Sequence, residues 1–214
     1  AMAKQVGWRS SIFGPYFVVG AIFSGVSAVM AVLLVVRKGM NLQYFLRKEH
    51  FDALAKLTLI FSFTWAYFFF NDYLIEWYGG EWVGHQLLTL QARGPLAPFW
   101  YLMLVCNIVI PWGTLWSKRV RQSPIALFFI SLVIQVGMYM ERFIIIPGFL
   151  QRQRLPFNWG EYSPRAPELS IVIGTLALIC LLYVLASRVI PLIPVWEVLE
   201  GQLSHSRRRI GKTV

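Results

Sequence analysis

The chain has 214 residues, of which 57% are hydrophobic and 16% are aromatic, and it carries a net charge of +10. One soluble domain of this length cannot bury so many apolar side chains in its core, so the excess must face lipid. Lys and Arg lie in short clusters between apolar segments, which argues against a nucleic-acid partner and indicates contacts with anionic headgroups of membrane lipid.

Five apolar stretches are long enough to cross a bilayer as helices, because about 20 residues span its hydrocarbon core. They cover residues 13–36, 53–75, 97–116, 124–146 and 169–189, and charged residues, Gly or Pro bound each of them. We therefore predict an all-α membrane protein with five transmembrane helices, which form a four-helix bundle and one extra helix.

The segments around these helices divide the chain further. We expect an extracytoplasmic segment at 1–12, the bundle at 13–146, a loop at 147–168, the fifth helix at 169–190 and a basic tail at 191–214. Within the bundle, residues 37–52 carry Leu42, Phe45 and Leu46 at helical spacing among charges, which predicts a cytoplasmic helix in the membrane interface. The loop at 147–168 either covers a partner outside the membrane or forms a solvated lid.

The positions of Lys and Arg predict the direction of the chain, because positively charged loops stay in the cytoplasm. The connections after the first, third and fifth helices hold most of these cations. We therefore expect the N-terminus outside and the C-terminus in the cytoplasm. Since the first residue is Ala and the number of helices is odd, we also expect that further helices precede Ala1.

Polar residues inside the second helix form a pattern. Ionisable groups at membrane depth are costly and usually form pairs, line water or carry protons. One face carries, every three or four residues, Thr58, Ser62, Trp65, Phe69, Asp72 and Glu76. This face can hold a water wire, with Lys56 at its cytoplasmic end. The alternative is that the hydroxyls bond backbone carbonyls while the two carboxylates lie among lipid headgroups.

The fourth helix carries a second polar group. Its spacing places Ser131, Gln135, Tyr139 and Arg142 on one face, with Glu141 about 100° away. Because the second and fourth helices run in the same direction, we expect an ion pair between Asp72 and Arg142. The pair either fixes helix packing or belongs to a proton-loading site.

Small and helix-bending residues mark the first and third helices. The first helix carries Gly20, Ser24, Gly25 and Ser27, which predict a face for close helix contact. On the third, Asn107 and Pro111 predict either packing or a hydrated bend, since Pro frees a carbonyl.

Residues that could ligate a metal are scattered. The two cysteines, Cys106 and Cys180, lie in separate apolar stretches, and the histidines His50, His85 and His205 lie in predicted loops or tails. We therefore expect no metal, haem or iron–sulfur cluster bound by this chain.

Five motifs together resemble the NrfD/polysulfide-reductase-C (PsrC) family. They are GWRSSIFGPYFVVGAIFSG from Gly7, HFDALAKL from His50, FFFNDYLIEWYGG from Phe68, FWYLMLVCN from Phe99 with Pro111 beyond it, and MYMERFIIIPGFL from Met138. The resemblance covers nearly the whole chain. It is strongest to the C-terminal half of ActC, the quinol-oxidising membrane subunit of alternative complex III.

The resemblance implies a subunit of a bacterial inner-membrane complex that oxidises menaquinol or another quinol. Electrons would pass to iron–sulfur clusters and c-type haem, held by an iron–sulfur subunit and cytochrome c subunits, beside a homologous NrfD-like membrane subunit. This chain would bind no cofactor itself but would lie near menaquinone. The alternative is a non-catalytic scaffold that docks the redox subunits, and an independent transporter is disfavoured because no inverted repeat is seen.

The resemblance also suggests roles for particular residues. A proton path through the bundle would use His50, Asp52, Lys56, Thr58, Ser62, Asp72, Glu76, Tyr139, Glu141 and Arg142. The quinol pocket of the family lies mostly in the preceding bundle, and Trp8 and Arg9 would border it. Relatives often have His where this chain has Arg9, so a proton-accepting His is lost there. The path either pumps protons or is a packing network, and no catalytic residue is assigned.

Overall fold

The computed structural model describes residues 7–8, 10–79, 82–150 and 165–189. The elements in these ranges are all helices: α1 (Phe13–Gly39), α2 (Lys48–Tyr78), α3 (Trp82–Arg93), α4 (Ala97–Leu104), η1 (Val105–Val109), α5 (Ile110–Leu115), α6 (Lys118–Arg121), α7 (Pro124–Phe143), η2 (Ile144–Gly148) and α8 (Ala166–Val189). Five helical stretches are long and apolar enough to cross a membrane. The predicted class, an all-α membrane protein, is confirmed.

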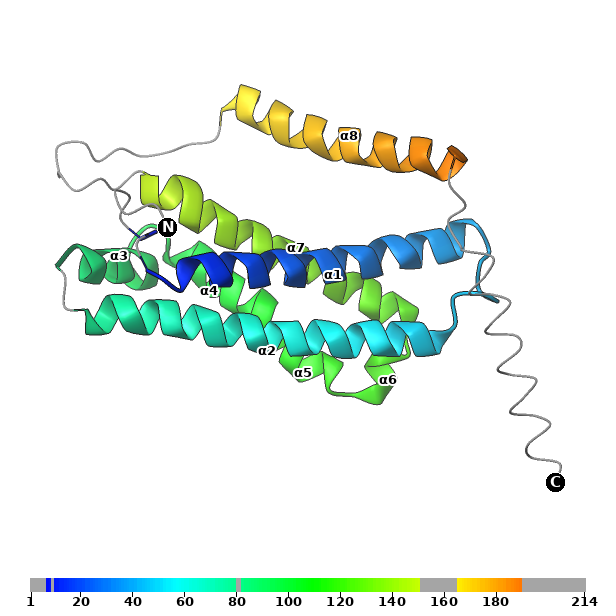
Figure 1. Cartoon of the computed structure of the whole chain (residues 1–214), viewed down its shortest axis with the longest axis horizontal. Coiled ribbons are helices and arrows are strands. Elements are labelled where there is room, and N and C mark those ends of the chain that lie inside the picture. Colours follow the sequence, from blue (N-terminus) through cyan, green and yellow to red (C-terminus); the bar gives the residue numbers. More distant parts are fainter. Residues whose placement is uncertain (1–6, 9, 80–81, 151–164, 190–214) are drawn as a thin grey trace. The chain divides into compact units, whose positions relative to one another are not determined.

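The chain divides into two compact units, Ala1–Tyr162 and Ser163–Val214. In the first unit, α1, α2 and α7 run side by side, and the stretch from α4 to α5 packs against α2 and α7 (Figure 1). Fully buried side chains such as Phe23, Met30, Trp65 and Ile134 fill the space between these helices. The outward faces carry exposed apolar side chains, as expected of helices surrounded by lipid.

The second unit contains α8. Its described apolar side chains are exposed, and those of Leu169, Ile173, Leu176 and Leu181 are more than half exposed. A helix that is apolar on all sides is typical of a membrane span. Residues 151–164 of the predicted loop at 147–168, and the whole predicted tail at 191–214, lie outside the described residues.

Pro111 interrupts the backbone hydrogen bonding of the third span. Proline has no N–H, so the carbonyl of Asn107, four residues earlier, loses its usual helical donor. The hydroxyl of Ser62 in α2 donates to this carbonyl at 2.6 Å, and the chain before Pro111 widens into the π-helical turn η1. This direct bond supports packing over the hydrated bend.

No separate interfacial helix forms between α1 and α2 in the described residues, so the helix predicted over residues 37–52 is wrong. α1 continues to Gly39 and α2 begins at Lys48, and the residues between them form turns. Asn41 has a φ of 52°, a left-handed conformation that breaks the helix and that Asn tolerates. The apolar spacing instead reflects one isolated turn, in which the Leu46 N–H donates to the Leu42 carbonyl.

The structure contains a helix that the sequence did not predict. α3 follows α2 and is too short to cross a bilayer, but it buries Leu87 and Gln91 against the bundle. His85 lies in this helix and His50 lies in the first turn of α2, so placing these two histidines in loops was wrong. His205 lies outside the described residues.

Candidate functional site

A cavity of about 20 Å³ lies among the residues where α1 begins and α2 and α7 end. We call this end of the bundle the α3 end and the opposite end the α6 end. The polar residues that line the cavity are Tyr16, Asp72, Tyr73, Gln91 and Glu141. A volume of this size accommodates about one water molecule, which needs two to four polar partners. The cavity therefore joins two carboxyl groups from different helices through space for water.

Glu141 is the most deeply buried ionisable residue of this site, with 1% of its surface exposed. The indole N–H of Trp65 donates to its Oε1 at 3.0 Å. Its Oε2 lacks a well-aligned hydrogen-bond partner among the described residues, although Arg142 Nη2 lies 3.8 Å from it and the Tyr16 hydroxyl also approaches the carboxyl group. Since a buried polar atom without a partner is costly, Oε2 is the atom that a water in the cavity would satisfy.

Asp72 and Arg142 do not form the ion pair that the sequence predicted. Asp72 Oδ1 accepts a hydrogen bond of 2.5 Å from the hydroxyl of Ser10. The guanidinium of Arg142 instead lies 3.8 Å above the ring of Phe17 in α1. The prediction is wrong because successive helical residues point about 100° apart, so that Arg142 turns toward α1 when Glu141 faces the interior.

Gly20 makes room for this position of Arg142. A Cβ on Gly20 would lie 2.9 Å from Arg142 Nη2 and 3.2 Å from Met138 Cε. The close contact predicted from the small residues of α1 therefore exists at Gly20. Gly25 is different, because it is exposed and a Cβ added there would meet no atom within 4 Å. Its predicted part in the contact face is wrong, since it points away from the other helices.

The serines of the same face contact α7. Gln135 Nε2 donates to the Ser24 carbonyl at 2.7 Å and to Ser27 Oγ at 2.6 Å. Ser131 is buried and donates to the Leu127 carbonyl within α7. Tyr139 is 51% exposed and, two residues from Glu141, points about 200° away from it. The structure therefore does not bring Tyr139 to the cavity.

A hydrogen-bonded chain from three helices forms another wall of the cavity. Trp100 Nε1 in α4 donates to the Tyr73 hydroxyl at 2.8 Å, and this hydroxyl donates to Gln91 Oε1 in α3. Gln91 is only 2% exposed. Sequence reasoning missed these residues, although Tyr73 adjoins Asp72. Gln91 gave no signal, because its burial depends on the unexpected helix α3.

The polar face predicted on α2 points inward over most of its length. Thr58, Ser62, Trp65 and Phe69 are all buried. However, Thr58 Oγ1 donates to the Leu54 carbonyl of its own helix, and Ser62 bonds the freed Asn107 carbonyl. These bonds favour the packing alternative for the hydroxyls.

Glu76 lies beyond the cavity, beside the first turn of α3. A Cβ on Gly84 would lie 2.5 Å from Glu76 Oε2. Glycine at this position therefore allows the carboxylate to approach the backbone of α3. An acidic group beside the beginning of a helix is favourable because the N-terminal end of the helix dipole is positive.

At the α6 end, Asp52 is held by two cations. Lys56 Nζ lies 2.6 Å from Oδ2, and Arg121 Nε lies 2.8 Å from Oδ1. Arg121 Nη1 also donates to the carbonyls of Leu115 and Trp116. The neighbouring His50 is exposed. The arrangement ties the beginning of α2 to the turn between α5 and α6.

Trp8 lies at the α3 end. Its Nε1 donates to the carbonyl of Ile145 at 3.0 Å, and its ring stacks on Phe13 at 6.1 Å between centroids. Arg9, which the sequence paired with Trp8 beside a quinol pocket, lies outside the described residues. The Trp8 indole N–H is therefore bonded within this chain.

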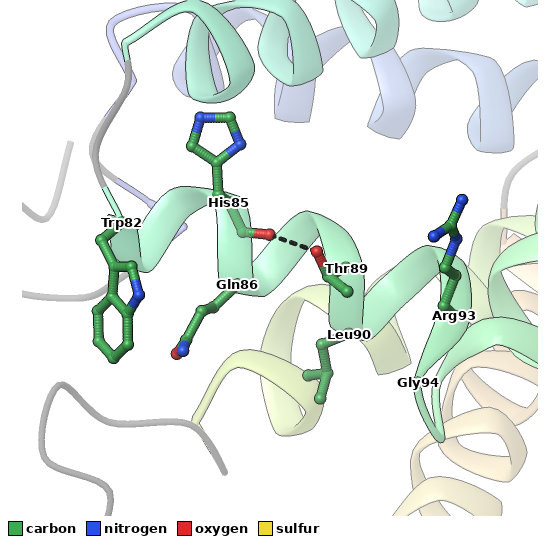
Figure 2. Close-up of a pocket in the computed structure, with 7 residues that line it drawn as sticks. All are labelled: Trp82, His85, Gln86, Thr89, Leu90, Arg93 and Gly94. Atoms are coloured by element: carbon green, nitrogen blue, oxygen red, sulfur yellow. Dashed lines mark hydrogen bonds between the residues drawn. The ribbon is translucent and has the colours of Figure 1, made fainter.

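An open groove of about 410 Å³ follows α3 and is lined by Trp82, His85, Gln86, Thr89, Leu90, Arg93 and Gly94. In Figure 2 the His85 side chain points to the opposite side of the helix from Gln86 and Leu90. The Thr89 hydroxyl donates to the His85 carbonyl at 2.8 Å and so serves its own helix (Figure 2). Because none of the described residues that line the groove is a carboxylate, the cavity with Asp72 and Glu141 is the stronger candidate site.

Comparison with known proteins identifies the family. The family described as polysulphide reductase, NrfD, matches residues 1–152, which include every helix from α1 to η2. No curated protein sequence matches the chain. The family match covers well over half of the residues and includes the whole cavity. The chain belongs to the polysulphide reductase NrfD family.

Proposed function

We propose that this chain carries protons for a quinol-oxidising membrane complex, with the cavity between Asp72 and Glu141 as a proton-transfer site. Membership of the NrfD family makes the chain a multi-pass membrane subunit of a quinone-linked redox complex. Proteins of this family work with iron–sulfur and other redox subunits. Menaquinol as the quinol, a bacterial inner membrane with the α3 end outside, and c-type haem in partner subunits belong to the proposal.

One observation supports the proposal above all others. Glu141 is 1% exposed, and its Oε2 lacks a well-aligned hydrogen-bond partner among the described residues, although it borders a water-sized cavity that Asp72 also lines. An ionisable residue at membrane depth usually serves transport or proton transfer. A residue that only packs helices would satisfy both carboxyl oxygens.

The chemical step assigned to this chain is proton transfer. Oxidation of a quinol elsewhere in the complex releases two electrons to one-electron carriers of the partner subunits and two protons. In the cavity, the protonated carboxyl group of Glu141 would give its proton to a water, which passes another of its protons to the carboxylate of Asp72. No other reactant is required. A volume of about 20 Å³ is too small for a quinone ring, so the quinol itself binds outside this cavity.

The test uses the complex purified with its partner subunits and reconstituted into liposomes. In Glu141→Gln and Asp72→Asn the cavity keeps its shape but loses a group that exchanges protons. We expect the complex to assemble normally. We expect its rate of proton release, measured while quinol is oxidised, to fall at least tenfold. The matched control is Glu49→Gln, because Glu49 is exposed in the first turn of α2. Proton release unchanged in both cavity variants would exclude the proposed function.

A non-catalytic scaffold is the second candidate, and the α6 end favours it. There each carboxylate oxygen of Asp52 forms an ion pair, one with Lys56 and the other with Arg121. We call these three residues the clamp. A scaffold would tolerate Glu141→Gln and Asp72→Asn with full activity. It would instead lose partner subunits when the clamp is broken, which native gel electrophoresis detects.

A further inference from the structure

Three contacts hold the segment before α1 against the walls of the cavity. Gly7, with a φ of 84°, packs so closely on Phe149 that a Cβ there would lie 2.5 Å from the ring. Trp8 Nε1 donates to the carbonyl of Ile145, and Ser10 Oγ donates to Asp72 Oδ1. All three partner residues line the cavity. The segment is therefore fastened to the site at Gly7, Trp8 and Ser10.

The contact of Ser10 has a chemical consequence. Ser10 is 7% exposed, and its hydroxyl has a single hydrogen to donate, which it gives to Asp72. A hydrogen bond donated to a carboxylate is charge-assisted, and it favours the ionised form of the acid. The bond also fixes the rotamer of Asp72. Ser10 can therefore hold the Asp72 carboxyl group in the orientation that accepts a proton from the cavity.

We infer that Ser10 is a positioning residue that prepares Asp72 to accept the proton from the cavity, and that Gly7 and Trp8 hold Ser10 in place. This inference rests on the proposed function, because it assumes that Asp72 receives protons. Tyr16 from α1, Tyr73 and Glu76 from α2 and Glu141 from α7 are the other titratable groups that face Asp72. Among the described residues, Ser10 in the segment before α1 donates a hydrogen bond to the Asp72 carboxylate.

The experiment compares three variants in the complete complex in liposomes, with proton release measured as a function of pH. Ser10→Ala removes the donor and Ser10→Thr retains it, whereas Ser11→Ala is a control because Ser11 is exposed and adjacent. Without the donor, the carboxylate of Asp72 loses its charge-assisted hydrogen bond from Ser10. We expect the half-maximal pH of proton release to rise by about one unit in Ser10→Ala, which corresponds to the loss of a hydrogen bond to a charged group.

The Thr variant should restore the wild-type profile, and Ser11→Ala should not change it. A second measurement uses Trp8→Phe, which keeps the ring but loses the donor to Ile145. This change should loosen the segment and shift the profile in the same direction by a smaller amount. A merely structural role of Ser10 would lower the amount of assembled complex without moving the profile.

The two proposals fail differently. If Glu141→Gln and Asp72→Asn both release protons at the wild-type rate, the proposed function is wrong and the role of Ser10 falls with it. If Asp72→Asn is impaired while Ser10→Ala has the same pH profile as Ser11→Ala, the inference about Ser10 is overturned and the proposed function stands.

Discussion

The Ser62 hydroxyl in α2 donates to the backbone carbonyl of Asn107, the carbonyl that Pro111 leaves without its helical donor. The bond is 2.6 Å long and buried, and Trp112 Nε1 donates in turn to Ser62 Oγ at 3.1 Å. One residue of α2 thus compensates for a proline in the third span. In a membrane this matters because no water is available there for a freed backbone group.

We predict that Ser62→Ala destabilises the protein by about 1 kcal/mol, the scale of one hydrogen bond inside a membrane protein. Pro111→Ala restores an N–H near the Asn107 carbonyl, so the double variant should lose less stability than the sum of the single variants. Thermal unfolding in lipid nanodiscs measures the effect. Thr64→Ala is the control, because Thr64 is half-buried on the same helix and its hydroxyl makes an exposed hydrogen bond to the carbonyl of Ile60. Strict additivity in the double variant would contradict the assigned role of Ser62.

Gly137 is predicted to tolerate no side chain. A Cβ there would collide with Asn107 Oδ1 and lie 2.7 Å from Cys106 Cβ, so α7 and η1 would have to separate. Gly137→Ala should cost about 1–3 kcal/mol, as overpacking of a core does. Gly113→Ala is the matched control, since no atom lies within 4 Å of the added group. Equal unfolding temperatures for the two variants would show that these helices can adjust freely.

Trp65 is predicted to stabilise the buried Glu141 through its indole N–H. Trp65→Phe keeps aromatic packing on Phe69 but leaves Glu141 Oε1 without its donor. The loss should be about 1–3 kcal/mol, the cost of an unsatisfied buried group. Adding Glu141→Leu removes the acceptor as well, so the double variant should recover part of this loss. A double variant that is less stable than Trp65→Phe alone would disprove this account of the pair.

Arg121 is predicted to be the structural centre of the α6 end. Arg121→Ala removes the ion pair with Asp52 and the donors to the Leu115 and Trp116 carbonyls together. We expect a clear fall in the unfolding temperature. Arg121→Lys should recover only part of it, since an ammonium group lacks the planar fork of donors. Arg119→Ala is the control, because Arg119 is exposed and lies two residues away. The same measurement on Asp52→Asn, combined with proton release, separates a structural role of Asp52 from a part in proton uptake.

Part of the site could be predicted because it depends on helical periodicity alone. The inward face of α2 follows from residues three and four apart, and Trp65 and Ser62 are buried on it as expected. The depth of Asp72 and Glu141 follows from counting residues along two helices that run in the same direction. The partners of these carboxyl groups could not be predicted in this way. They depend on the rotation of each helix about its axis, and a rotation of one residue exchanges Glu141 for Arg142.

The sequence by itself determined the class of the protein, its membrane spans and its likeness to the NrfD family, because hydrophobic length and local motifs are properties of continuous segments. Only the tertiary structure decided that Ser10 bonds Asp72, that Gln91 enters the cavity and that Arg142 turns away to Phe17. These contacts join residues far apart in the chain. Their geometry depends on how α1, α3 and α7 pack around α2, which no single segment encodes.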